Sequence, residues 1–180
     1  MILSFDDFYE GCTSYDLLFE LKKRIPQLKV NIFTILGRCS LNWIKNTSAI
    51  PWIELIPHGW FHNGPECKIW TKEETLDYLD LIEPLGLTKG FKAPGYVASK
   101  GTYEAIIERD YWICDIERRS GRWPEGLRVY LNNTPDRVQG HIGRLPGHFG
   151  RMKDGLKEKF DYYASLTGEF LFIKDIMEVR

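Results

Sequence analysis

Short apolar segments alternate with amphipathic ones along most of the chain. The segment 30–36 is rich in β-branched and other apolar residues and stops at Gly37, which predicts a strand. The first apolar residues, 1–5, predict a strand that ends at two carboxylates. The same pattern predicts further strands at 52–56, 90–93, 112–116, 127–131, 137–142 and 169–173.

Segments with helical spacing lie between these strands. Leucines between residues 15 and 24 fall on one helical face, and Pro26 closes the segment. Thr71 is the predicted N-cap of the next helix, with Glu74 as its capping-box partner and Pro84 at its end. Two more helices are predicted at 101–109 and 156–164.

Strands that alternate with helices predict an α/β fold of parallel βαβ units, either an open doubly wound sheet or a barrel. The chain has 180 residues, whereas a full eightfold barrel takes about 250. A reduced or distorted (β/α) barrel would fit this length. Because no linker, repeat or low-complexity segment marks a boundary, residues 1–180 are expected to form a single domain.

The composition is that of a globular protein, with 24 basic residues almost balancing 25 acidic ones. This balance does not point to nucleic acid, and the cluster of Arg118, Arg119 and Arg122 is interpreted as a solvated loop. The four cysteines form no CxxC pair, so free thiols are expected rather than a cysteine zinc site. Since no apolar run approaches about 20 residues and the start resembles no signal peptide, we expect no membrane span and a cytoplasmic location.

Unusual polar residues follow several of the predicted strands. Asp6 and Asp7 follow the first strand, His58 and His62 the third, and His141 ends a late one. In parallel α/β folds the loops after the strand carboxyl ends share one face, so these side chains could converge although they are far apart in sequence.

His58 and His62 have the i, i+4 spacing that places two imidazoles on one face of a helical turn, where they could share a metal ion. Two unrelated histidines are the alternative. Adjacent carboxylates at Asp6 and Asp7 would repel unless a cation lay beside them, although one could simply cap a helix or turn. On an extended segment their side chains point in different directions, so one could ligate while the other faces substrate. Two histidines and a carboxylate leave open the coordination positions that a catalytic metal needs.

Four short motifs, in order, carry a resemblance to the polysaccharide-deacetylase (NodB-homology) superfamily, which includes carbohydrate esterase family four. They are Ser4-Phe5-Asp6-Asp7, His58-Gly59-Trp60-Phe61-His62, Phe91-Lys92-Ala93-Pro94-Gly95 and Gln139-Gly140-His141. The resemblance implies an incomplete barrel that hydrolyses an N-acetyl group from an amino sugar. It also implies metal ligation by Asp7, His58 and His62, a general base at Asp6 and a general acid at His141.

In the implied reaction a metal-activated water attacks the acetyl carbonyl, Asp6 takes the proton and His141 protonates the leaving amine. The oxyanion would be held by the metal and by a backbone N–H of Gly95 or Tyr96, in the loop of Pro94. Zinc is the expected ion, with cobalt, nickel or manganese as alternatives, and an N-acetylated carbohydrate is the expected partner.

The chain departs from the family pattern at some positions. Lys92 stands where the family has Arg, which keeps the charge but loses the bidentate fork. His148 is an alternative to His141, and Trp123 is the candidate for the family's tryptophan. Trp60 either lines the sugar groove or packs beneath the site. A glycan-binding module without activity and a hydrolase of another amide or ester therefore remain alternatives.

Overall fold

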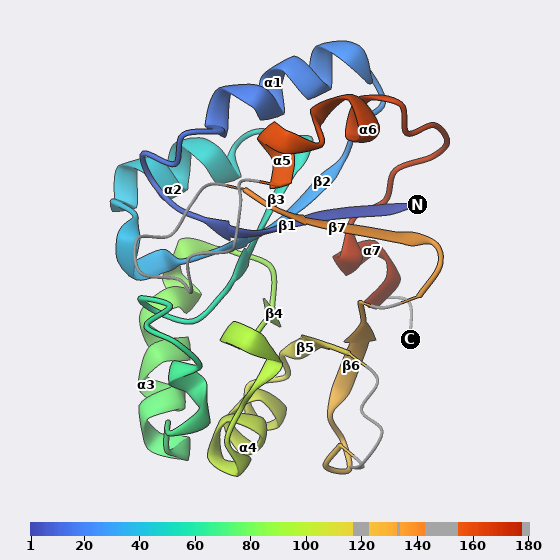
Figure 1. Ribbon diagram of the computed structural model, residues 1–180. Coiled ribbons are helices and arrows are strands. Elements are labelled where there is room, and N and C mark those ends of the chain that lie inside the picture. The colour runs from blue at the N-terminus through green and yellow to red at the C-terminus, as the bar shows by residue number, and fades with distance from the viewer. Residues whose placement is uncertain (117–122, 133, 143–154, 178–180) are drawn as a thin grey trace.

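The computed structural model describes residues 1–116, 123–132, 134–142 and 155–177 (Figure 1). The strands within these residues are β1 (Ile2–Phe8), β2 (Val30–Thr34), β3 (Ile53–Pro57), β4 (Gly90–Phe91), β5 (Trp112–Asp115), β6 (Arg128–Leu131) and β7 (Arg137–His141). The α-helices are α1 (Tyr15–Arg24), α2 (Leu41–Ser48), α3 (Lys72–Ile82), α4 (Lys100–Glu108), α5 (Gly155–Glu158), α6 (Phe160–Ala164) and α7 (Ile173–Met177). Short 3₁₀ turns lie at η1 (Leu36–Arg38), η2 (Glu66–Lys68), η3 (Glu83–Leu85) and η4 (Pro94–Tyr96).

The described strands form two parallel sheets, with the orders β3-β2-β1-β7 and β4-β5-β6. Their edges meet at β3 and β4, where the Lys92 N–H donates to the Pro57 carbonyl at 3.0 Å. The predicted α/β class with parallel strands is therefore confirmed. In place of the single barrel sheet that was expected, the strands that the structure describes form two neighbouring sheets.

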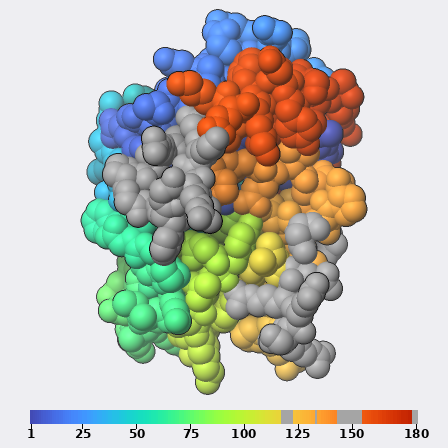
Figure 2. All heavy atoms as spheres, viewed as in Figure 1, coloured from blue at the N-terminus to red at the C-terminus, as the bar shows by residue number. Residues whose placement is uncertain are grey.

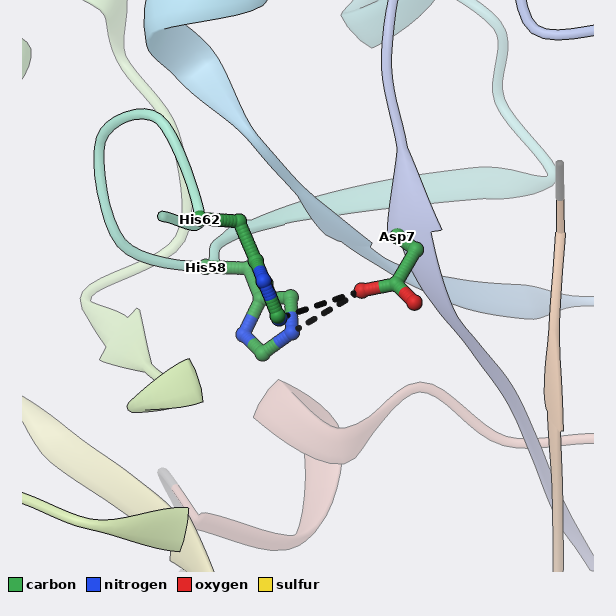
Figure 3. A group of neighbouring side chains, drawn as sticks. All are labelled: Asp7, His58 and His62. Carbon is green, nitrogen blue, oxygen red and sulfur yellow. Dashed lines mark ion pairs between the residues drawn. The ribbon is translucent and has the colours of Figure 1, made fainter. Parts of the chain in front are cut away.

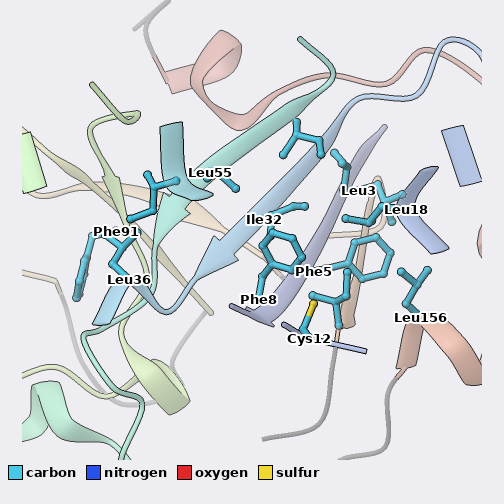
Figure 4. Close-up of a cluster of buried hydrophobic side chains, with 14 of the residues drawn as sticks. Leu3, Phe5, Phe8, Cys12, Leu18, Ile32, Leu36, Leu55, Phe91 and Leu156 are labelled. Carbon is cyan, nitrogen blue, oxygen red and sulfur yellow. The ribbon is translucent and has the colours of Figure 1, made fainter. Parts of the chain in front are cut away.

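The core lies around the first three strands, whose residues are all buried. Strands covered on both faces have continuous apolar runs, which explains why the sequence pattern marks them so clearly. Leu3, Phe5 and Ile32 pack here with Leu18 of α1 and Leu156 of α5 (Figure 4). Helices α1 and α6 lie side by side over this part of the molecule, as the blue and red segments of Figure 2 show.

The last predicted strand, 169–173, is wrong, because Ile173 begins helix α7. The buried side chain of Asn31 takes over the role of a strand partner here. Its Nδ2 donates to the Leu171 carbonyl at 3.2 Å, and its Oδ1 accepts from the Ile173 N–H at 2.8 Å. One side chain thus satisfies backbone groups that a sheet ladder would otherwise need to satisfy.

Two helix predictions also differ from the structure. The segment 156–164 contains two helices, α5 and α6, separated at Lys159, whose φ of −117° is not helical. Helix α2 is capped by Ser40 but was not predicted. Few of its side chains are buried and Leu41 is 64% exposed, so the sequence shows no clear apolar face there. Among the described residues, no helix is long and apolar enough to cross a membrane. The four cysteines are free thiols, as predicted.

Candidate metal centre

Side chains from the carboxyl ends of β1, β3, β4 and β7 line one pocket of about 600 Å³. The convergence predicted from strand order is therefore present. The lining residues are Asp6, Asp7, His58, His62, Gly64, Pro65, Lys92, Gly95, Tyr96, Val97, Gln139 and His141.

Asp7, His58 and His62 point toward one another in this pocket (Figure 3). The Asp7 Oδ1 lies 3.5 Å from the His58 Nε2 and 3.3 Å from the His62 Nε2. One ligand atom from each of the three lies within 4.8 Å of the others, and all three residues are buried. The His58 Nδ1 lies 2.9 Å from the Lys92 carbonyl and donates to it, so the Nε2 is the ring nitrogen that faces Asp7 and could bind a metal ion. This donor set fits one divalent ion with open coordination positions.

The two histidines do not lie on a helical turn, so that part of the prediction is wrong. His58 directly follows β3, and the chain then turns through Gly59 and His62, whose φ values are 66° and 56°. The Glu66 carboxylate holds this loop by accepting the N–H groups of Trp60 at 2.6 Å and His62 at 2.9 Å. An added Cβ on Gly59 would collide with this carboxylate. The sequence reasoning missed Glu66, which a search for a carboxylate just beyond the second histidine could have found.

The Asp7 carboxylate remains negatively charged despite its burial. Burial would raise its pKa, but a hydrogen bond from His58 and the nearby charges of His58, His62 and His141 lower the pKa to about 2. A carboxylate that stays ionised among imidazole groups is a suitable partner for a divalent cation.

Asp6 forms a separate buried ion pair with Lys92. The Lys92 Nζ donates to Oδ1 at 2.7 Å and to Oδ2 at 2.6 Å, so it contacts both oxygens. The ammonium also lies over the rings of Phe33, at 4.5 Å, and Tyr96, at 4.4 Å. Burial would lower the pKa of Lys92, but the charge of Asp6 raises it overall, so the amine stays protonated.

The Asp6 carboxylate has two further neighbours on β7. The Gln139 Nε2 donates to Oδ2, and the His141 Nε2 lies 3.8 Å from the same oxygen. His141 ends its strand as predicted and lines the pocket. The residue before it is Gly140, where a side chain would be crowded: an added Cβ would lie 2.9 Å from the Phe5 ring. Sequence reasoning included Gln139 in a motif but gave it no role.

Three predicted substrate contacts lie outside the pocket lining that the structure describes. Trp60 is partly buried and packs on Tyr78, with ring centroids 5.8 Å apart. Pro94 is buried at the start of the 3₁₀ turn η4, which also contains Gly95. The Trp123 Nε1 donates to the Asp115 Oδ2 at 3.1 Å. His148 lies outside the described residues, as do Arg118, Arg119 and Arg122.

No protein-family model matches the sequence, and no curated protein matches it. Solved structures do share its fold, among them the following three. One is a family 4 acetyl xylan esterase from Clostridium thermocellum in complex with a cobalt ion, with 14% identity, a TM-score of 0.63 and coverage of 99% of this chain and 90% of that chain. Another is the Xyl-CE4 domain of a multidomain xylanase from the hindgut metagenome of Trinervitermes trinervoides, with 12% identity, a TM-score of 0.58 and coverage of 99% and 89%.

The third is a peptidoglycan N-acetylglucosamine deacetylase, with 13% identity, a TM-score of 0.64 and coverage of 98% of this chain and 87% of that chain. The chain has the family 4 carbohydrate esterase fold. The resemblance inferred from four short motifs is thus confirmed for the fold. In this family 4 fold, the candidate metal ligands come from the ends of β1 and β3.

Proposed function

We propose that the chain is a single-domain, metal-dependent hydrolase that removes an N-acetyl group from an amino-sugar-containing glycan or glycolipid. The observation that carries this proposal is the presence of two adjacent carboxylates with different partners in one pocket. Asp7 faces two histidines, whereas Asp6 faces Lys92. Such an arrangement separates a metal ligand from a general base. The shared fold with carbohydrate esterases supports a carbohydrate substrate.

Asp7, His58 and His62 would hold the ion, with zinc the first candidate and cobalt, nickel or manganese the alternatives. When bound, the ion would supply Lewis acidity and lower the pKa of water. Asp6, paired with Lys92, would accept the proton of the attacking water.

His141 would protonate the leaving amine, since it lines the pocket and its side chain is 31% exposed. Of the two backbone donors proposed for the oxyanion, the Tyr96 N–H already donates to the Ala93 carbonyl at 2.9 Å. The Gly95 N–H is therefore the better candidate, at a residue whose φ of 63° and absence of a side chain let substrate approach closely.

Acetate release from N-acetylglucosamine oligomers tests this proposal. We expect turnover that a chelator abolishes, that zinc restores and that Asp6→Asn abolishes. Asp77→Asn is the matched control, because Asp77 is an exposed residue of α3. Stoichiometric metal binding without turnover of any acyl substrate would favour the glycan-binding module. Turnover of small amides or aryl esters alone would favour a different hydrolase.

A further inference from the structure

Gln139 lies two residues before His141 on β7, so both side chains point to the same face of the strand and into the pocket. Its amide nitrogen contacts the Asp6 Oδ2, not the candidate metal ligands. We propose that Gln139 is a positioning residue that fixes the orientation of the Asp6 carboxylate. This inference rests on the proposed function, in which Asp6 is the general base.

The orientation of the Gln139 amide is fixed by its other end. The Oε1 accepts a hydrogen bond from the Tyr96 hydroxyl at 2.8 Å and another from the Asn132 Nδ2. The Asn132 NH₂ group can only donate to this oxygen and the Asp6 carboxylate can only accept, so a flipped amide would lose both contacts and the Gln139 NH₂ group faces Asp6. The Asn132 Nδ2 also donates to the Tyr96 Oη at 2.9 Å, which closes a triangle of polar groups.

This triangle of polar groups holds Gln139 in place, and Gln139 in turn orients the Asp6 carboxylate, which Lys92 alone would not do. An ammonium is a compact point charge that can move around a carboxylate, whereas a guanidinium fork fixes the carboxylate plane. The Lys92 Nζ contacts both Asp6 oxygens, and Gln139 adds a second donor on Oδ2 from another strand. With two donors from different directions, rotation of the carboxylate would break at least one contact.

Tyr96 connects the two donors to each other. Its ring lies 4.4 Å from the Lys92 Nζ, while its hydroxyl donates to Gln139. Burial raises the pKa of Tyr96 further, so its hydroxyl remains a donor at neutral pH. Asn132 is buried at the end of β6, so the support for Asp6 extends to both sheets. Gln139 thereby acquires a role in the site.

Gln139→Leu removes both ends of the amide while keeping a similar size. We expect kcat for acetate release to fall about 10- to 100-fold, because a displaced general base loses much of its contribution. KM should stay within about twofold and zinc affinity should not change, since the variant leaves the metal ligands in place. Gln27→Leu, at the only other glutamine of the chain, is an exposed control that should match the wild-type protein.

A double-mutant cycle with Asn132→Ala separates positioning from a structural role. If Asn132 acts through Gln139, its substitution should lower kcat in the wild-type background but not further in Gln139→Leu. Thermal unfolding of each variant verifies that the compared proteins are folded. A folded Gln139→Leu protein with wild-type kcat, or independent effects of the two substitutions on kcat, would overturn the inference while the proposed function stands. No acetate release by the wild-type protein would overturn both.

Discussion

Glu66 should determine the position of His62, although it is not itself a candidate ligand. Its carboxylate accepts the backbone N–H groups of Trp60, Phe61 and His62 at 2.6, 3.1 and 2.9 Å. Glu66→Gln keeps the shape of the side chain but replaces three charge-assisted hydrogen bonds by weaker ones. Each such replacement costs about 1 kcal/mol, and partial exposure to solvent reduces the sum, so we expect a loss of about 1–3 kcal/mol in the free energy of unfolding.

The same substitution should weaken zinc binding about 10- to 100-fold, because residues that support a metal ligand influence affinity by this amount. Urea unfolding of the metal-free protein and competition with a chromophoric chelator measure the two effects. Glu125→Gln is the control, because Glu125 is exposed and lies in the turn before β6. Unchanged unfolding energy together with unchanged zinc affinity in Glu66→Gln would refute the idea that this carboxylate holds the loop.

Three further substitutions test the buried charges and the loop. Lys92→Met should destabilise the protein by about 3–5 kcal/mol in urea unfolding, because it leaves a buried carboxylate without its cation, whereas Lys89→Met, at an exposed ion pair, should cost less than about 1 kcal/mol. In the same urea unfolding assay, Gly59→Ala should lower the free energy of unfolding clearly more than Gly11→Ala. Both glycines have a positive φ, but an added Cβ at Gly59 would lie 2.8 Å from the Pro94 ring, whereas one at Gly11 would meet nothing within 4 Å. Without metal, the lowered pKa of Asp7 stabilises the fold above pH 4, and this contribution of about 2–3 kcal/mol should disappear as the pH falls from about 4 to 2. Acid unfolding of Asp7→Asn should lack this dependence, and an identical acid transition in both proteins would contradict the assignment.

Local patterns predicted the central strands and the capped helix well. The strands β1 to β3 are buried on both faces, so their apolar runs are unambiguous, and the capping box of Thr71 and Glu74 is present in the structure. Errors occur where a distant side chain decides the local structure. Asn31, about 140 residues before the segment in sequence, binds the backbone of Leu171 and Ile173 at the start of α7, and no local pattern contains that contact.

In the candidate site too, local sequence patterns predicted some features, whereas contacts between distant residues determine others. The residue types of Asp7, His58 and His62 indicated a metal site, and the structure brings their ligand atoms together. The helical turn expected for the two histidines was wrong, because the i, i+4 spacing is also compatible with a loop whose N–H groups converge on one carboxylate. Gln139 and Asn132 act through side-chain contacts between different strands, and a single sequence does not reveal these.

The side chains of the adjacent residues Asp6 and Asp7 can enter one pocket only if the strand is irregular at this point. On a regular strand, the side chains of Asp6 and Asp7 would point to opposite faces of the sheet. In the structure both line the same pocket, because the pairing of β1 with β2 shifts register between Phe5 and Phe8 and Asp7 takes a φ of 66°. Irregularities of this kind redirect side chains beside active sites, and aspartate tolerates the left-handed region better than a β-branched residue does. The local backbone strain is therefore linked to function: it directs two like charges into one pocket, where two histidines and one lysine provide them with separate partners.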